Sequence, residues 1–215
     1  MIRLLPCGDR AILVDLDDDR ERRDFDAALR AEIAAGRLAD EIIEHVPAAR
    51  TVLVRLRDPR HRGSVETALH SLEVGAACVE DQSSGEVTVP VHYDGADLQA
   101  LAHQLGVRPT ELVEWHTATP WLVDFTGFAP GFGYLVREPV GSPLDDVEIP
   151  RLDSPRTRIP AGAVALAGRW SAVYPSASPG GWQLIGGTDL PIWDVDRDPP
   201  GLFRAGVRVR FEVMP

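Results

Sequence analysis

The feature that most constrains this chain is a pair of segments rich in glycine, proline and aromatic residues. They are residues 127–135, GFAPGFGYL, and residues 174–188, YPSASPGGWQLIGGT, and each lies between stretches with the pattern of ordinary strands. Paired glycines let backbone N–H groups approach a ligand without an obstructing Cβ, and prolines hold a loop in one shape. A domain that builds two such loops is expected to present a surface to a ligand or a partner.

Composition narrows the class of protein. The 215 residues suffice for one large domain or two small ones, and the hydrophobic share of 44% is that of a globular protein. The net charge of −11 argues against nucleic acid as a partner. No apolar run approaches the ~20 residues of a membrane span, and the first residues lack a signal-peptide pattern. Cys7 and Cys78 are expected to be reduced and buried, which makes the cytoplasm the expected compartment.

All 22 basic residues are arginine, so the chain has no lysine. The absence of lysine excludes a Walker A phosphate loop, a Schiff-base enzyme and a biotin attachment site on this chain. The histidines show no metal-ligand spacing, and only two distant cysteines accompany them, so no metal site is expected.

The first part of the chain, residues 1–83, has an α+β pattern. Short apolar strands are predicted at 11–16, 41–46 and 51–56. One amphipathic helix carries Phe25 and Leu29 and stops at Gly36, and a second carries Val65 and Leu69. The order β-α-β-β-α predicts a small ferredoxin-like domain. The polar, turn-rich residues 81–85, DQSSG, mark the expected domain boundary.

The second part, residues 84–215, has a mainly-β pattern. A half-buried strand at 87–93 is followed by two short helices, the first ended by Gly106 and the second begun by Pro109. From residue 119 onward, short strands alternate with Pro/Gly turns up to an alternating strand at 207–213. This pattern is typical of an all-β barrel.

Residues 178–182, SPGGW, are the first candidate binding motif. Consecutive N–H groups at Gly180 and Gly181 can form an anion-binding nest, and Trp182 offers a flat face for a ring. A tight turn with a core tryptophan is the alternative interpretation. Ser178 does not lie in a G-x-S-x-G elbow, so it is a candidate substrate contact and not a nucleophile. Thr188, at the end of the same segment, is a further candidate.

Cationic side chains form the second group of candidates. Arg151, Arg156 and Arg158 lie on a proline-stiffened segment, and their planar forks suit a carboxylate or a phosphate; the alternative is a solvated face paired with nearby acids. His116 closes the second short helix, where a protonated imidazole is favoured and could bind an anion or act as an acid, or simply cap the helix. We expect His116 and Arg156, the catalytic candidates, to face one cleft near the Gly180–Gly181 pair.

The aromatic loop contributes the third group. Core packing, an exposed protein interface and a ligand wall are the possible interpretations, and exposed aromatic residues beside Gly and Pro are common in interfaces. We therefore expect an interface or ligand wall. Its members are Phe128, Pro130, Gly131, Phe132 and Tyr134.

The order of these motifs resembles that of the PxpB/KipI family, the first subunit of two-part 5-oxoprolinases, also called allophanate hydrolase subunit 1. The resemblance covers most of the chain, but its specific motifs all follow Val89. Two positions depart from the family pattern: Ala163 stands where a serine is usual and Gly187 where an arginine is usual, so a ligand contact at either position is in question. The matching motifs are His116, residues 127–135, the Pro-Arg pairs at 150–151 and 155–156, residues 159–168 and residues 174–188.

The resemblance implies both a fold and an activity. It implies a cyclophilin-like barrel for residues 84–215, within a non-autonomous subunit of an ATP-dependent lactam hydrolase that converts 5-oxo-L-proline to L-glutamate. It also implies a PxpC-type second subunit, a PxpA-type protein, and ATP with Mg²⁺ held by the complex. Two alternatives are a KipI-like inhibitor of a sensor histidine kinase and a urea carboxylase or allophanate hydrolase-type subunit. The spacing assembles no complete active site on this chain, so the site is expected between subunits.

Overall fold

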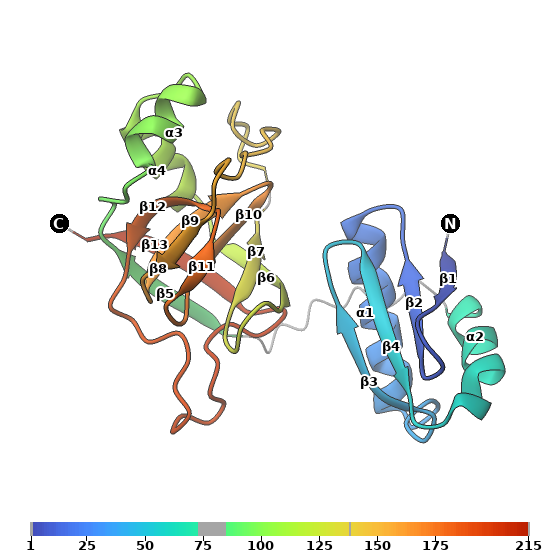
Figure 1. Ribbon diagram of the computed structural model, residues 1–215. Helices are drawn as coiled ribbons and strands as arrows, with labels where there is room; N and C mark the ends of the chain where they lie inside the picture. The colour runs from blue at the N-terminus through green and yellow to red at the C-terminus, as the bar shows by residue number, and fades with distance from the viewer. Residues whose placement is uncertain (1, 73–84, 138, 215) are drawn as a thin grey trace. The chain divides into compact units, whose positions relative to one another are not determined.

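The computed structural model describes residues 2–72, 85–137 and 139–214. Internal contacts divide the chain into two compact units, Met1–Gln82 and Ser83–Pro215 (Figure 1). Residues 81–84, which make up most of the predicted link, and Cys78 lie outside the described residues. Cys7 is a free thiol but is exposed, so the prediction that it is buried was wrong. Among the described residues, every helix is too short or too polar to cross a membrane.

The first unit is a four-stranded antiparallel sheet in the order β1-β2-β4-β3, with two helices packed on it (Figure 1). Phe25 and Leu29 of α1 are fully buried against alternate residues of β2 and β4, such as Val14 and Val54. The elements are β1 (Arg3–Pro6), β2 (Ala11–Asp15), α1 (Asp19–Ala34), β3 (Ile42–Pro47), β4 (Thr51–Leu56), the 3-10 helix η1 (Pro59–His61) and α2 (Arg62–His70).

The boundaries of α1 follow from local chemistry. The Asp18 carboxylate accepts the Glu21 N–H at 2.8 Å, which satisfies one of the free donors in the first turn. The helix ends just before Gly36, whose φ of 79° lies in the left-handed region that glycine adopts without strain. The helix predicted from Phe25, Leu29 and the glycine stop is therefore confirmed.

The ferredoxin-like architecture predicted for this unit is not confirmed. The predicted strands and helices are present, but a further strand, β1, forms a hairpin with β2 and becomes the sheet edge beside it. The sequence did not indicate β1, because four residues ending in a proline show no usable periodicity.

The second unit is a nearly closed mixed β-barrel with two helices (Figure 1). Its seven-stranded sheet has the order β12-β9-β10-β7-β6-β13-β5, and β13 pairs with β5 in parallel. A separate ribbon pairs β8 with β11. The elements are β5 (Glu86–Val91), α3 (Leu98–Gln104), α4 (Pro109–Thr117), β6 (Trp121–Thr126), β7 (Gly133–Val136), β8 (Arg156–Ile159), β9 (Ala163–Ala167), β10 (Trp170–Val173), β11 (Ser178–Gly180), β12 (Gln183–Gly187) and β13 (Arg208–Val213).

The two ends of this sheet meet through backbone hydrogen bonds that follow β5. His92 and Gly187 exchange N–H···O bonds of 2.9 Å in each direction, and the Gly95 N–H donates to the Ile185 carbonyl at 3.2 Å. The close approach requires glycine, because a Cβ at Gly186 would lie 2.5 Å from the His92 carbonyl oxygen. The mainly-β barrel predicted from the short strands is therefore confirmed as a nearly closed barrel.

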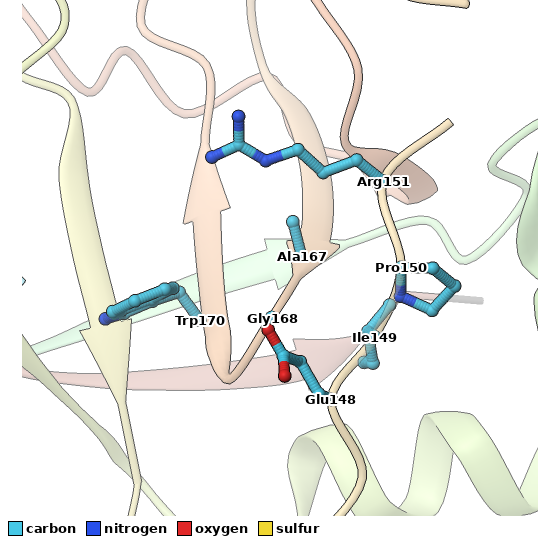
Figure 2. A pocket seen from close by; sticks show the side chains of 7 residues that line it. All are labelled: Glu148, Ile149, Pro150, Arg151, Ala167, Gly168 and Trp170. Carbon is cyan, nitrogen blue, oxygen red and sulfur yellow. The ribbon is translucent and has the colours of Figure 1, made fainter. Parts of the chain in front are cut away.

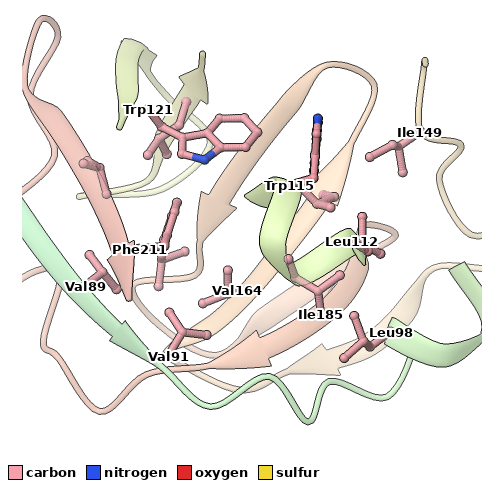
Figure 3. Close-up of a cluster of buried hydrophobic side chains, with 14 of the residues drawn as sticks. Val89, Val91, Leu98, Leu112, Trp115, Trp121, Ile149, Val164, Ile185 and Phe211 are labelled. Atoms are coloured by element: carbon pink, nitrogen blue, oxygen red, sulfur yellow. The ribbon is translucent and has the colours of Figure 1, made fainter. Parts of the chain in front are cut away.

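Apolar side chains fill the barrel and continue under the helices (Figure 3). Val164 of β9, Ile185 of β12 and Phe211 of β13 are almost fully buried. Leu98 of α3 and Leu112 of α4 belong to the same cluster, so the helices extend the barrel core. The alternation predicted for residues 207–213 is confirmed as far as Phe211, since Val207, Val209 and Phe211 are buried and Arg208 and Arg210 are more exposed. At the end of the strand it was wrong, because Val213 is 58% exposed.

The two adjacent glycines of β12 provide a matched test of barrel closure. We expect Gly186→Ala to lower the free energy of unfolding by about 1–3 kcal/mol, because its methyl group would displace backbone at the closure. The denaturant midpoint should fall accordingly. Gly187→Ala is the control, because the nearest atom to an added Cβ there is 3.9 Å away. All five tryptophans lie after residue 83, so tryptophan fluorescence during chemical denaturation reports on this unit. Equal midpoints for the two variants would contradict the closure described here.

Candidate functional site

The outer side of the barrel wall carries a layer of aromatic side chains. Along β9, Val164 points into the interior, whereas the alternate alanines belong to an outer cluster with the rings. Alanine is small enough for rings to lie directly on the strand. Contacting ring centroids are 5.1 to 6.2 Å apart. The rings are Phe132, Tyr134, Trp170, Tyr174 and Trp182. The two glycine- and proline-rich segments therefore meet on one face of the barrel.

The first three residues of the SPGGW motif form β11, one strand of the ribbon. Gly180 in β11 lies opposite Arg156 in β8. Neither Gly180 nor Gly181 has a positive φ. The predicted nest needs alternating right- and left-handed residues, so this prediction was wrong. Trp182 is only 5% exposed and packs within the layer, and so it is not the open flat face that was expected.

Gly180 is nevertheless required, for a packing reason. A Cβ at this position would lie 2.5 Å from the Tyr174 hydroxyl and 2.7 Å from the Ile159 Cδ1. At Gly181, by contrast, the nearest atom to an added Cβ is the Leu152 carbonyl oxygen at 3.7 Å, an ordinary contact. The first glycine of the pair thus lets the ribbon approach the aromatic layer, and the second has room for a methyl group.

Arg156 is held by a carboxylate far away in the sequence. Its two terminal nitrogens donate to both oxygens of Asp97 at 2.9 and 2.7 Å. Asp97, which is 7% exposed, also accepts the Leu184 N–H at 2.7 Å. This pairing raises the pKa of Arg156, chiefly through the hydrogen bond to Asp97. Arg156 is therefore near the Gly180 backbone as predicted, but its charge is already compensated.

Residues 148–151 border a pocket beside the aromatic layer (Figure 2). Its volume is about 440 Å³, and Arg151, Glu148 and Trp170 are its main polar or aromatic side chains. Arg151 is exposed and forms no ion pair with any residue that the structure describes. Burial raises the pKa of Tyr134 and of Tyr174, and the positive charge of Arg151 partly opposes both shifts. Arg151 is thus a cation next to the aromatic layer.

The other binding candidates lie in different settings. Arg158 is exposed on β8. The Ser178 hydroxyl oxygen is buried and has no hydrogen-bond partner among the described residues. Thr188 is buried, and its hydroxyl accepts the Leu190 N–H at 3.2 Å, which fits a turn-forming role. Within the described ranges, no group of three or more His, Cys, Asp or Glu is arranged to hold a metal ion.

The aromatic loop divides into a packed part and an exposed part. Phe132 is buried in the layer and Tyr134 is half-buried, stacked on Phe125 at 4.4 Å. Phe128 is 63% exposed and has a φ of 71°, an uncommon conformation for a residue with a side chain. Pro130 is also exposed, and Gly131 lies against Trp193. The exposed part therefore consists of Phe128 and Pro130 beside the half-exposed Trp193.

His116 is placed differently from the prediction. Its ring is fully buried, with Nδ1 2.7 Å from the Tyr93 hydroxyl oxygen and Nε2 2.8 Å from the Ser171 Oγ. Burial, assisted by the Arg137 charge, lowers the pKa of His116 to about 3. The expected protonated imidazole facing a cleft with Arg156 was therefore wrong, because tertiary packing encloses this end of α4. Any catalytic role for His116 stays a prediction.

The buried histidine predicts how stability depends on pH. The pKa of His116 is about 3 in the folded protein and ~6.5 in an unfolded chain. Below pH ~6.5 the unfolded chain binds a proton at this histidine and the folded protein does not. The free energy of unfolding is therefore unaffected by His116 above pH ~6.5 and falls by about 1.4 kcal/mol per pH unit as the pH falls toward 3. We expect this dependence between pH 6.5 and 5 to be weaker in His116→Gln, as measured by denaturant unfolding. The control, His103→Gln at an exposed position, should keep the wild-type dependence. Identical slopes in all three proteins would contradict a neutral buried His116.

Sequence reasoning missed three residues of this region. Asp97 directly precedes the predicted helix, a position that normally indicates a helix cap, yet its side chain binds Arg156 and the Leu184 N–H. Trp170 and Glu148 line the pocket but belong to no motif. The alternation of Trp170, Ala172 and Tyr174 was the available signal for an outward-facing set on one strand.

Comparisons with known proteins agree on the kind of domain. A family model described as "Carboxyltransferase domain, subdomain C and D" matches residues 2–203. The 5-oxoprolinase B subunit of Escherichia coli O157:H7 is 38% identical over 187 residues, covering 82% of this chain and 81% of that protein. The 5-oxoprolinase B subunit of Bacillus subtilis (strain 168) is 42% identical over 58% of this chain and 51% of its own length.

Solved structures extend this likeness to the fold. TTHA0988 superimposes with a TM-score of 0.76 at 31% identity, covering 100% of this chain, which spans only 40% of TTHA0988. The urea amidolyase of K. lactis has a TM-score of 0.75 at 19% identity over 99% of this chain and 15% of its own, and at that identity it supports the fold alone. The extent of the family match and the identity to the Escherichia coli protein decide the assignment. The chain belongs to the carboxyltransferase subdomain C and D family, in the branch of the 5-oxoprolinase B (PxpB) subunits.

Proposed function

We propose that this chain is a non-autonomous subunit of an ATP-dependent 5-oxoprolinase, acting with a PxpC-type subunit and a PxpA-type protein. The observation that carries the proposal is the 38% identity, over 82% of this chain, to a protein named as the B subunit of a 5-oxoprolinase. The geometry is compatible with a subunit role. The two most obvious catalytic candidates, His116 and Arg156, are respectively enclosed and already paired.

The reaction needs groups that the described residues of this chain do not bring together. A lactam is a stable amide, and its oxygen must be activated, for example by phosphorylation, before water can open the ring. The described residues offer no nest at Gly180–Gly181 and no acidic cluster for Mg²⁺, and the sequence has no lysine. These residues do not fit a nucleotide site, so we assign ATP and Mg²⁺ to the complex. The role of this chain in the complex is then to bind and orient a ligand beside the aromatic layer.

The packing of the barrel wall restricts where this chain can bind a ligand. Val164 and Leu166 fill the interior, while the alternate alanines of β9 receive the aromatic rings on the outside. A wall with both faces covered offers no open sheet surface to a ligand in this part of the described barrel. The side chains that contact a ligand must therefore come from the segments at the edge of the layer, where Arg151 and the exposed part of the aromatic loop lie. The packed wall supplies the rigidity that these segments lack by themselves.

The exposed part of the aromatic loop is our proposed contact with the partner subunit. Phe128 is 63% exposed, and Trp193, next to Gly131, is 41% exposed. Val195, two residues further along the chain, is 79% exposed. Aromatic residues are enriched at the centres of protein interfaces, where their burial contributes most of the affinity.

Substitution of Phe128 tests this contact. Phe128→Asn removes the ring but keeps a residue that tolerates the left-handed backbone, so folding should be preserved. We expect affinity for the co-expressed partner to fall about tenfold or more. Val213→Thr changes another exposed apolar side chain, on β13, and is the control. Wild-type affinity for Phe128→Asn in a sedimentation or interferometry titration would place the interface elsewhere.

The activity itself is tested by reconstitution. We expect the purified chain alone to release no glutamate from 5-oxo-L-proline with ATP and Mg²⁺. The same chain co-expressed with PxpC-type and PxpA-type proteins should release glutamate with matching ATP consumption. Turnover by the single chain, or none by the reconstituted complex, would refute the proposal. Inhibition of a histidine kinase, or activity on urea with a biotin-bearing partner, would instead support one of the two alternative family functions.

A further inference from the structure

Two oppositely charged side chains, Arg151 and Glu148, line the pocket beside Trp170. Figure 2 shows Arg151 extending across the strand that carries Ala167, while Glu148 lies at the other end, beside Gly168. Both residues are exposed, and neither forms an ion pair with the other or with any other residue in the described part of the chain. The pocket thus offers one cation and one anion that are free to bind complementary groups.

The backbone that carries these two charges is fixed at three residues, Ile149, Pro150 and Leu152. The Ile149 N–H donates to the Gly168 carbonyl at 2.9 Å, and the Gly168 N–H donates back to the Ile149 carbonyl at 2.7 Å. The Gln183 amide nitrogen donates to the Pro150 carbonyl at 3.0 Å. The Leu152 N–H donates to the Gly181 carbonyl at 2.8 Å. Because the segment is anchored to the barrel wall and to the ribbon, the attachment points of Arg151 and Glu148 are held in place before any ligand arrives.

The rest of the wall is apolar. Ala167 and Ile149 contribute to the lining although they are almost fully buried, and Pro150 and the Trp170 ring complete its apolar part. A volume of about 440 Å³ lies in the lower part of the range for small-molecule sites. A short hydrocarbon body or a five-membered ring can therefore lie against Pro150 and the Trp170 ring while its polar groups reach the two charges.

We propose that this pocket binds a small amino-acid-like anion, with a carboxylate on the Arg151 guanidinium and an N–H or ammonium group on the Glu148 carboxylate. A guanidinium recognises a carboxylate through two parallel hydrogen bonds, and a carboxylate accepts a nitrogen-borne proton. The identification rests on the proposed function, because both 5-oxo-L-proline and L-glutamate carry a carboxylate and an N–H donor on a short carbon skeleton. It assigns ligand contacts to Glu148 and Trp170, which lie outside every motif of the sequence.

Direct titration of the purified chain tests the pocket without any turnover. 5-Oxo-L-proline and L-glutamate are titrated while ligand-observed NMR and tryptophan fluorescence are recorded. We expect Arg151→Gln to weaken binding about tenfold or more, with partial recovery in Arg151→Lys, which keeps the charge but not the fork. Arg204→Gln, an exposed arginine outside the pocket, is the matched control and should bind as the wild type does.

A second pair of variants tests the other end of the ligand. Glu148→Gln should weaken binding of 5-oxo-L-proline but not of a cyclopentane carboxylic acid that lacks the ring nitrogen. Asp146→Asn, an exposed acid outside the pocket, is its control. Denaturant unfolding of each variant shows whether any lost binding reflects lost folding.

The outcomes separate the pocket from the proposed activity. Absence of binding by the wild-type chain at millimolar ligand, or unchanged binding in Arg151→Gln, would overturn the pocket even if the reconstituted complex hydrolyses 5-oxo-L-proline. Binding that depends on Arg151 and Glu148, in a complex that releases no glutamate, would retain the pocket and refute the activity.

Discussion

The carboxylate of Asp97 is the interaction on which the arrangement of the barrel unit depends. It is 7% exposed and receives the Leu184 N–H of β12 together with the two terminal nitrogens of Arg156 in β8. A carboxylate this far from water is tolerated only when it is paired and hydrogen-bonded. The start of α3, the closing strand and the ribbon therefore hold one another in place. Gly181, which directly follows the ribbon strand β11, accepts the Leu152 N–H through its carbonyl. This bond anchors the segment that borders the pocket.

Local patterns in the sequence predicted most elements and which of their faces are buried. Phe25 and Leu29 indicated α1, and the alternation at Val209 and Phe211 indicated β13, because those periodicities record directly which face meets a core. The chemical state of the candidate residues could not be predicted in the same way. His116 is neutral because Ser171, 55 positions later, and other distant residues enclose it. Arg156 is paired with Asp97, 59 positions earlier, and not with the acids beside it in the sequence.

The glycine motif shows a second limit of sequence reasoning. A ligand that approaches the backbone and a ring that packs on it both require the absence of a Cβ, so a glycine pair is compatible with either. In the structure, Gly180 serves packing, because the Tyr174 hydroxyl and Ile159 occupy the space of its missing side chain. Both motifs meet in the aromatic layer, whereas the backbone N–H groups of Gly180 and Gly181, to which binding was attributed, form no nest there. The charges available to a ligand on this surface belong instead to side chains on the adjoining segment.

The distribution of charge also indicates why a chain of this kind would need partners. The interior histidine is neutral and Arg156 is compensated, whereas Arg151 and Glu148 are charges on an anchored segment without an ion pair among the described residues. Such a pair can orient a ligand, but neither group supplies a phosphoryl donor. Under the proposed function, positioning and activation are divided between chains, and the reactive groups reach the ligand from the open side of the pocket. In the same proposal, the partner attaches to the exposed aromatic loop, which contacts the aromatic layer beside the pocket through Phe128 and Phe132.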